Sequence, residues 1–469
     1  MVGSDRRTEQ FMLIRFFLVV FLATSTLPQV ISTQVGEIKE RVLGKIIGNV
    51  SKIVRSETTD GCHFAYITEI NSKQVVVIDG KPDPEFDSIG QETLTFSRDG
   101  RHIAYTAQVG EKWMVVVDGK LEPAYDDVSS PIFSLDGKRL AYGAKKLNKW
   151  LLVIDGKETQ YYDGIAIGMP KFSSDGRRVA YACRVGDKWM VVIDGKISQA
   201  YEKIGTETPV FSQDGKRVAY IAKVSNKWLV ILDDQAEQEF TRIGAKSLVF
   251  SPDGMRLAYA AQQGARWYVI VDGQTNGGFD GGFDGVLLET PIFSSDGKQV
   301  AYGAKINNKW HVYVNGQASP GYDGVGMLKF SPDGRRLIYI AGDGYKQMVV
   351  VDGQVGPEYD GTLQGTPIFS PDGKSIVYGA QMGHKWIMVV GEKTMLEYDS
   401  FLDGPVSFSP DGKKLAFGVN RGNMQMVIID GKQGPEYNGI VAGPVFTNAG
   451  SVEYCARKGD SLLLVTHKI

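Results

Sequence analysis

Phe211-Ser212-Gln213-Asp214-Gly215 is one copy of a five-residue string, Phe-Ser-x-Asp-Gly, that decides the fold of this 469-residue chain. The string occurs nine times, and successive copies lie 37 to 43 residues apart. The copies begin at Phe96, Phe133, Phe172, Phe211, Phe250, Phe293, Phe330, Phe369 and Phe408. Degenerate copies at Asp60-Gly61 and at 446–450 bring the total to eleven units. A fixed period of this length indicates a repeat architecture.

The unit over residues 206–244 divides into four predicted strands joined by tight turns. The strands are expected over Pro209–Ser212, Lys216–Val224, Lys227–Leu232 and a polar segment that ends at Phe240. The turns are Asp214-Gly215, Ser225-Asn226 and Asp233-Asp234. We expect a type I′ turn at Asp214-Gly215, because Asp-Gly favours that turn between twisted antiparallel strands. Four short strands in about 39 residues are typical of a propeller blade.

An aromatic residue stands six positions after each turn aspartate, and the residue before it is small or aliphatic. Successive strand residues face opposite sides of a sheet. One face of each sheet therefore has large aromatic side chains, and the other has small side chains. We therefore expect the sheets to stack, with each aromatic against the alanine of the next blade. The aromatics are Tyr66, Tyr105, Tyr142, Tyr181, Tyr220, Tyr259, Tyr302, Tyr339, Tyr378 and Phe417.

Every tryptophan of the chain lies fourteen residues after a turn aspartate, and a basic residue precedes each one. They are Trp113, Trp150, Trp189, Trp228, Trp267, Trp310 and Trp386. The fixed position predicts a ring of indoles near the hairpins that join the second and third strands. Two interpretations stay open. In the first, the indoles pack between blades under the aliphatic stems of the lysines, which the presence of tryptophan at the same position of most repeats favours. In the second, the ring of indoles binds a ligand or partner through its aromatic faces and the nearby cations.

The composition also points to an all-β fold, with 56 Gly, 21 Tyr and 21 Phe. Single propellers usually have 4 to 8 blades, so about eleven repeats favour two propellers in tandem. A short duplication at 278–285 suggests a first propeller of about six blades over 36–285 and a second of about five over 286–469. A harmless loop insertion explains the same duplication equally well.

The Phe-Ser-x-Asp-Gly turn followed by a basic second strand, as at 250–254 and 369–373, resembles the WD40-like (PD40-type) repeat of TolB-type β-propellers. The resemblance covers the chain from about Gly44 onward, although the Trp-Asp dipeptide and the Gly-His opening of WD40 repeats are missing. It implies a periplasmic or secreted propeller that binds partners. It names no ligand, because the shared motif is structural.

The N-terminal residues have the pattern of a secretory signal peptide over 1–32. Arginines at 6, 7 and 15 precede an apolar run over 16–23, and small polar residues follow. Cleavage fits after Ser25 or after Ser32, and an uncleaved anchor is the alternative. Since the apolar run is shorter than the roughly 20 residues that span a bilayer, we expect an extracytoplasmic protein with no integral membrane span after cleavage.

The chain lacks the sequence signatures of catalysis. G-x-S-x-G, H-E-x-x-H, C-x-x-C and phosphate-binding loops do not occur in it. Its Asp-Gly pairs suit turns better than calcium loops, and Cys62, Cys183 and Cys455 are too scattered to suggest a disulfide framework. A formal net charge of −2 argues against nucleic acid as a partner. We therefore predict no catalytic residue, no metal and no cofactor.

The leading functional prediction is a non-catalytic exported scaffold for protein–protein binding, because no unit carries a distinctive polar constellation. The alternative is a lectin-like or small-ligand-binding propeller that uses equivalent pockets between blades. An enzyme with an axial site is less favoured, because the motifs that such a site uses are missing. The predicted partner is accordingly an unidentified protein or a glycan.

Overall fold

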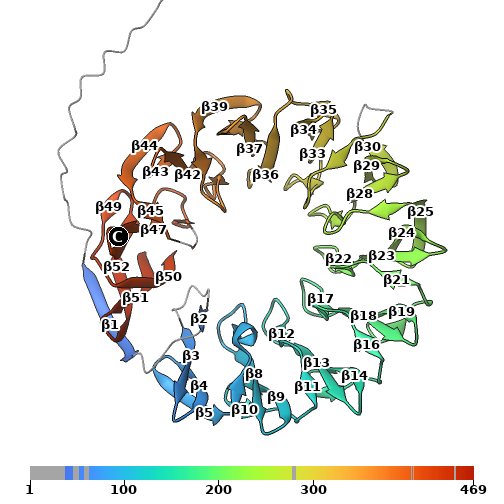
Figure 1. The fold of residues 1–469 in the computed structure, drawn as a ribbon, viewed down its shortest axis with the longest axis horizontal. Coiled ribbons are helices and arrows are strands. Elements are labelled where there is room, and N and C mark those ends of the chain that lie inside the picture. Colours follow the sequence, from blue (N-terminus) through green and yellow to red (C-terminus); the bar gives the residue numbers. More distant parts are fainter. Residues whose placement is uncertain are drawn as a thin grey trace, which may run out of the picture. The chain divides into compact units, whose positions relative to one another are not determined.

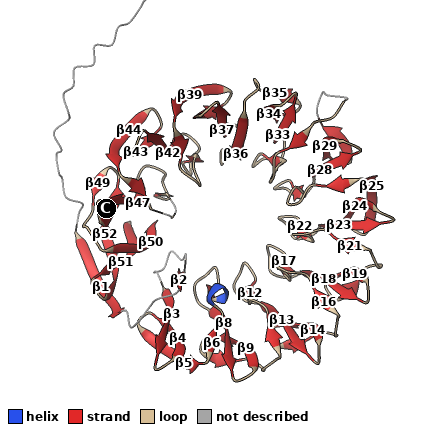
Figure 2. Cartoon of the chain, viewed as in Figure 1, coloured by secondary structure: helices blue, strands red, loops and turns tan. Residues whose placement is uncertain are grey.

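The computed structural model describes residues 37–45, 52–56, 63–276, 281–402, 404, 406–447 and 450–469. The predicted signal peptide and Cys62 lie outside the described residues. The described chain forms eleven antiparallel sheets that follow one another around a ring (Figure 1). Nearly all regular structure is strand (Figure 2), with one 3-10 turn, η1 (Gln91–Thr93). In this part of the chain, no helix is long and apolar enough to cross a membrane.

Each blade has an inner strand nearest the ring centre, often in two pieces, then two long central strands and an outer strand (Figure 1). The inner strands are β2 (Lys52–Arg55), β6 (Ser88–Ile89) with β7 (Thr95–Phe96), β11 (Asp127–Val128) with β12 (Ile132–Phe133), β16 (Gly164–Ile165) with β17 (Lys171–Phe172), β21 (Lys203–Ile204) with β22 (Val210–Phe211), β26 (Arg242–Ile243) with β27 (Val249–Phe250), β31 (Gly285–Val286) with β32 (Ile292–Phe293), β36 (Gly324–Phe330), β40 (Gly361–Thr362) with β41 (Ile368–Phe369), β45 (Ser400–Phe401) with β46 (Ser407–Phe408), and β50 (Gly439–Phe446).

The central strands carry most of the core. The second strands, which number the blades from 1 to 11, are β3 (Phe64–Ile70), β8 (Ile103–Val109), β13 (Leu140–Lys146), β18 (Val179–Val185), β23 (Val218–Val224), β28 (Leu257–Gln263), β33 (Val300–Ile306), β37 (Leu337–Asp343), β42 (Ile376–Met382), β47 (Leu415–Arg421) and β51 (Ser451–Lys458). The third strands are β4 (Lys73–Ile78), β9 (Lys112–Val117), β14 (Lys149–Ile154), β19 (Lys188–Ile193), β24 (Lys227–Leu232), β29 (Arg266–Val271), β34 (Lys309–Val314), β38 (Lys346–Val351), β43 (Lys385–Val390), β48 (Met424–Ile429) and β52 (Ser461–Lys468).

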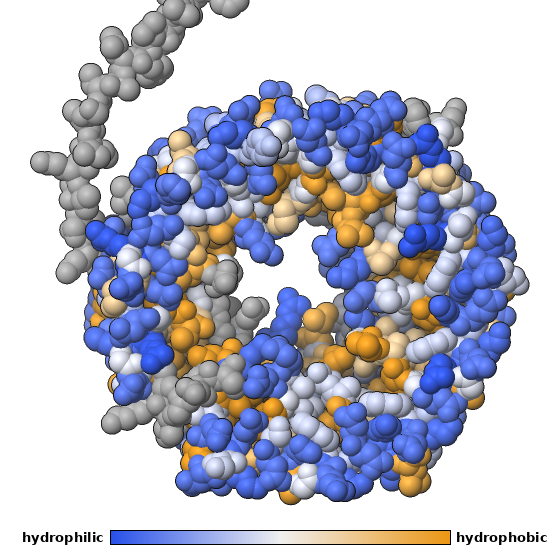
Figure 3. Space-filling view, viewed as in Figure 1, coloured by the Kyte–Doolittle hydropathy of each residue, from blue (hydrophilic) through white to orange (hydrophobic). Residues whose placement is uncertain are grey.

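The outer strands are short or polar and form the circumference. In blade order they are β5 (Lys81–Phe86), β10 (Lys120–Leu121), β15 (Lys157–Glu158), β20 (Lys196–Ile197), β25 (Gln235–Phe240), β30 (Gln274–Asn276), β35 (Gln317–Ala318), β39 (Gln354–Tyr359), β44 (Lys393–Tyr398), β49 (Lys432–Gln433) and β1 (Ile38–Lys45). Figure 3 shows a mostly hydrophilic circumference, hydrophobic residues nearer the centre, and an open passage through the ring.

The predicted four-strand unit is confirmed: β22, β23, β24 and β25 lie where the strands of residues 206–244 were expected. The first inner piece, β21, was missed because it is only two residues long. The turn type at Asp214-Gly215 was wrong. Only Gly215 has a positive φ (70°), whereas Ser225 and Asn226 both have one, as a type I′ turn requires. The Asp214 carboxylate instead accepts bonds from the Ser212 hydroxyl (2.6 Å) and the Lys216 N–H (3.1 Å), which holds the turn in another form.

All eleven blades belong to one ring, in place of the two tandem propellers that the sequence predicted. At the proposed division at 285/286, Ala258 and Val269 of blade 6 share a buried cluster with Tyr302 of blade 7, so packing continues without a break. The ring is closed by β1, which pairs with β52 as the outer strand of blade 11. Leu43 of β1 and residues of blade 11 then pack with Phe64 of blade 1.

Neighbouring blades pack through the predicted aromatics. Tyr259 of blade 6 is fully buried and meets Phe240 of blade 5 edge-on, with ring centroids 6.1 Å apart. The same cluster includes Ala219 of blade 5. The blades therefore stack as predicted, but in the opposite direction: the aromatic shares a cluster with the small or aliphatic residue of the preceding blade, as in Ala65–Tyr105, Ala258–Tyr302 and Ala301–Tyr339.

Candidate functional site

The seven tryptophans occupy one equivalent place in blades 2–7 and 9, the second residue of the third strand. All seven side chains are half-buried. Each pairs through its backbone with the aromatic residue that ends the outer segment of its own blade. The pairs are Trp113–Tyr125, Trp150–Tyr162, Trp189–Tyr201, Trp228–Phe240, Trp267–Phe283, Trp310–Tyr322 and Trp386–Tyr398. The structure thus distributes the indoles around the ring and gathers them at no single point.

In five of the seven blades with a tryptophan, the basic residue before it forms an ion pair with an aspartate instead of covering the indole as predicted. Lys309 binds Asp323 at 2.7 Å, and the second carboxylate oxygen of Asp323 accepts the Gly344 N–H of the next blade at 2.8 Å. These contacts lower the pKa of Asp323 to about 2. The same ion pair recurs as Lys73–Asp87, Lys112–Asp126, Lys149–Asp163, Arg266–Asp284, Lys346–Asp360 and Lys385–Asp399. Like Asp323, Asp163 and Asp360 also accept a backbone N–H of the next blade, from Gly186 and Gly383, so these aspartates connect adjacent blades.

The indoles contact the neighbouring blade where the structure describes their surroundings. Trp386 of blade 9 meets Phe401 of blade 10 edge-on at 6.1 Å. Trp150 of blade 3 lines a pocket of about 400 Å³ together with Ile167 and Met169 of blade 4. These contacts fit the packing interpretation. Because the tryptophans are not fully buried, ligand or partner binding by them stays a prediction.

We expect Trp189→Ala to lower the free energy of unfolding by about 2–3 kcal/mol, below the roughly 3–5 kcal/mol of a fully buried aromatic. The reason is that Trp189 is half-buried, so truncation removes only part of its contacts. Urea denaturation followed by circular dichroism measures the change, with Trp189→Phe as the volume-sparing control. An unchanged midpoint would contradict packing and leave recognition as the role of this position.

The hairpins between the second and third strands expose apolar side chains that the sequence analysis missed. We call their edge of the ring the hairpin rim. Its exposed apolar residues, in blades 2–5, 8 and 9, are Val109 (50%), Leu147 (81%), Val185 (50%), Val224 (36%), Tyr345 (99%) and Met382 (57%). Apolar residues in or beside turns, where polar residues are usual, were the signal that could have revealed them.

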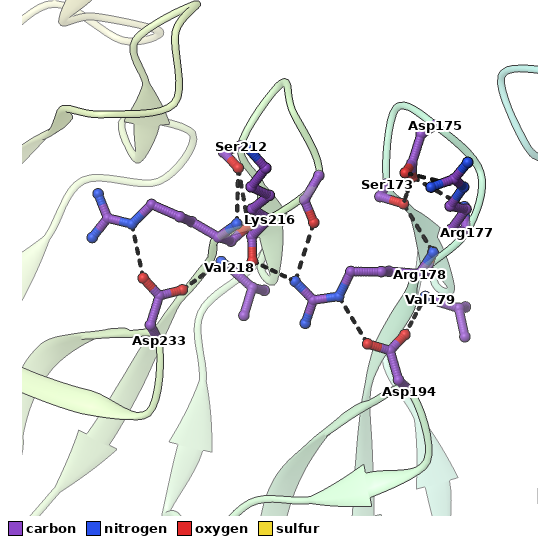
Figure 4. A network of polar contacts seen from close by, with 12 residues as sticks. Ser173, Asp175, Arg177, Arg178, Val179, Asp194, Ser212, Lys216, Val218 and Asp233 are labelled. Carbon is purple, nitrogen blue, oxygen red and sulfur yellow. Dashed lines mark hydrogen bonds and ion pairs between the residues drawn. The ribbon is translucent and has the colours of Figure 1, made fainter.

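The opposite rim is held by arginine clamps that use the other Asp-Gly turns (Figure 4). Arg178 of blade 4 donates Nε–H to Asp194 at 2.8 Å and binds the carbonyls of Gly215 and Lys216 of blade 5 at 3.1 and 2.7 Å. Its guanidinium also lies over the Phe211 ring, 5.2 Å from the centroid. Arginines with the same role are Arg139, Arg217, Arg256 and Arg336. These aspartates are therefore engaged in holding blades together.

Histidines take the place of this arginine in the first two blades. His63 and His102 bind Asp79 and Asp118 through Nδ1 at 2.6 and 2.8 Å. Both side chains are partly exposed, with 52% and 45% of their surface accessible. His467 differs, because it is fully buried, bonded to Tyr454 at 2.8 Å, and desolvation lowers its pKa to about 4.

Cys183 and Cys455 are both completely buried, and burial raises the pKa of the Cys183 thiol to about 12. Among the described residues, no group of three or more His, Cys, Asp or Glu side chains is arranged to hold a metal ion.

Known proteins resemble the chain only in structure. No protein-family model and no curated protein matches it. A eukaryotic initiation factor structure covers 84% of this chain and 97% of its own, with 13% identity and a TM-score of 0.43. The β-propeller domain of the Trilobed protease from Pyrococcus furiosus covers 58% and 96%, with 12% identity and a TM-score of 0.28. TolB from Acinetobacter baumannii covers 63% and 78%, with 16% identity and a TM-score of 0.25.

Proposed function

We propose that this protein is an exported, non-catalytic β-propeller scaffold that binds a protein partner through its hairpin rim. The observation that carries the proposal is the row of exposed apolar side chains on that rim, above all Leu147 and Tyr345. These residues come from two runs of consecutive blades, 2–5 and 8–9, and exposed apolar surface grouped in this way is typical of interaction sites. Export is proposed from the signal-like pattern of residues 1–32.

The indoles extend this surface. Each tryptophan lies a few residues from the exposed hairpin of its blade and keeps part of its ring accessible. The basic residue beside it is neutralised by an aspartate in most blades, as Lys112 is by Asp126. An interface built on aromatic anchors among neutralised charges suits a protein partner, because aromatic residues dominate the binding energy of protein interfaces.

A photo-crosslinking experiment tests the proposal. A benzoylphenylalanine replaces Tyr345 on the hairpin rim in one preparation, and Met255 on the opposite rim in a matched control. Both native side chains are highly exposed, at 99% and 74%. In envelope extract, we expect the Tyr345 probe to yield a discrete protein adduct and the Met255 probe to yield none.

Met382→Asp, on the hairpin of the adjacent blade 9, then shows whether that adduct depends on the apolar surface. Because a carboxylate on the rim must be desolvated on binding, we expect the crosslinked yield from position 345 to fall at least about tenfold. Equal adducts from both rims, or no adduct from position 345, would exclude partner binding through the hairpin rim.

A further inference from the structure

We propose that two equivalent pockets, one between blades 4 and 5 and one between blades 8 and 9, each bind a short neutral saccharide. Both pockets lie at the circumference beneath an arginine clamp of the kind drawn in Figure 4. Their volumes are about 750 and 530 Å³. The proposal concerns a place in the fold other than the hairpin rim, so it does not depend on the partner proposed above.

The pocket between blades 4 and 5 is built from both sheets. Its lining includes the aliphatic side chains of Val191 of β19 and Val218 of β23, and also Tyr201 and Tyr220, whose hydroxyls are 3.1 Å apart. The amide of Gln199 lies 3.3 Å from the Tyr201 hydroxyl. The pocket therefore combines aliphatic surface with neutral hydrogen-bonding groups.

The second pocket lies four blades after the first pocket along the chain and has a similar lining. Most of its lining residues stand 158 positions after a lining residue of the first pocket. The shared pairs are Arg178 and Arg336, Val191 and Val349, Tyr201 and Tyr359, Lys216 and Lys374, Val218 and Ile376, and Tyr220 and Tyr378. The hydroxyls of Tyr359 and Tyr378 lie 3.5 Å apart. The pockets differ where Ser198 and Gln199 of the first correspond to Gly356 and Pro357 of the second, so the features they share are the tyrosine pair, the arginine and the aliphatic residues.

Charge argues for a neutral ligand. In the first pocket the cations are paired with carboxylates: Arg178 with Asp194 at 2.8 Å and Lys196 with Asp234 at 3.2 Å. In the second, Arg336 is paired with Asp352 at 2.9 Å. Lys216 and Lys374 also line the pockets, and they lie 3.3 and 3.8 Å from the carboxylates of Asp214 and Asp372. An anionic ligand would have to compete with aspartates for these cations, and in the second pocket it would also meet the carboxylate of Glu392.

The mixture of groups favours a saccharide among neutral ligands. In both pockets tyrosine hydroxyls can donate and accept hydrogen bonds and the carboxylates paired with the arginines can still accept; in the first pocket the Gln199 amide also does both. Sugar hydroxyls need both kinds of partner in close succession, while the C–H face of a pyranose suits the aliphatic wall of Val191 and Val218. Two such sites on one rigid ring would also bind a polysaccharide with avidity.

The experiment measures stoichiometry with defined probes: maltose, cellobiose and N,N′-diacetylchitobiose. Native mass spectrometry counts bound disaccharides, and ligand-observed NMR measures their affinity. For at least one probe, we expect two sites on the full chain. Tyr201→Phe should weaken one site about tenfold, because a hydroxyl partner is lost, and adding Tyr359→Phe should weaken both.

Tyr125→Phe is the matched control, because Tyr125 holds the same position between blades 2 and 3, outside both pockets. We expect it to change neither stoichiometry nor affinity, and thermal melting verifies that all variants fold. The proposal fails if none of the probes binds, if binding is insensitive to Tyr201→Phe and Tyr359→Phe, or if extended peptides bind in the same two places and displace the sugars.

Discussion

Deleting residues 37–45 should open the ring and cost more stability than any single substitution. This segment is β1, which forms seven residue pairs with β52 and buries Leu43 against blade 1. Its Glu40 also accepts the Tyr437 hydroxyl at 2.9 Å. With hydrogen bonds worth about 1 kcal/mol each and a buried leucine worth about 2–5 kcal/mol, we expect a loss of at least about 5 kcal/mol.

Small-angle scattering and urea denaturation measure this outcome together. We expect a larger radius of gyration and a lower unfolding midpoint, and also concentration-dependent association, because β52 would become an exposed apolar edge. Val42→Ala is the control, since this β1 side chain is 64% exposed and should leave both values unchanged. A truncated chain with the native radius and midpoint would show that the remaining blades close without β1.

The second large effect is expected from Tyr259→Ala, which should lower the free energy of unfolding by about 3–5 kcal/mol. Tyr259 is fully buried, meets Phe240 of the preceding blade and donates its hydroxyl hydrogen to Glu237 at 2.7 Å. Truncation therefore leaves a cavity between two blades. Equilibrium unfolding in urea measures the loss.

Two further variants separate the causes of that loss. Tyr259→Phe keeps the ring and removes only the hydrogen bond, so we expect it to cost about 1 kcal/mol. Tyr345→Ala, at a tyrosine that is 99% exposed, should stay within about 0.5 kcal/mol of the unaltered protein. A large loss from Tyr345→Ala, or none from Tyr259→Ala, would contradict the account of inter-blade packing.

Local features of the blade could be predicted because they depend on short-range chemistry. The alternation of aromatic and small residues marks the central strands, and paired turn residues with positive φ, such as Ser225 and Asn226, mark the hairpins. The tryptophans were placed correctly in each blade for the same reason. Asp214-Gly215 was assigned the wrong turn type, because the Asp214 carboxylate bonds to Ser212 and Lys216 in a way that dipeptide preference does not encode.

The candidate site was predicted less well, because the contacts of its side chains depend on how neighbouring blades pack against each other. Lys309 looked like a cover for the indole beside it, and the structure pairs it with Asp323, fourteen residues away. The apolar hairpin residues, such as Leu147, gave no repeat-wide signal, since other blades carry polar residues there. The sequence predicted that pockets could lie between blades. It did not show which residues line them, because each pocket is formed by residues of two successive blades.

The Phe-Ser-x-Asp-Gly repeat by itself determined that the chain builds eleven four-stranded blades, because period, turns and strand faces are properties of each unit. Only the tertiary structure decided that these blades form one ring. Ring size follows from the small angle between adjacent sheets, which is set by packing such as that of Tyr259 on Phe240 and by clamps such as Arg178. Closure by β1 is likewise a contact between residues more than 400 positions apart, as between Ile38 and His467, and no local pattern contains it.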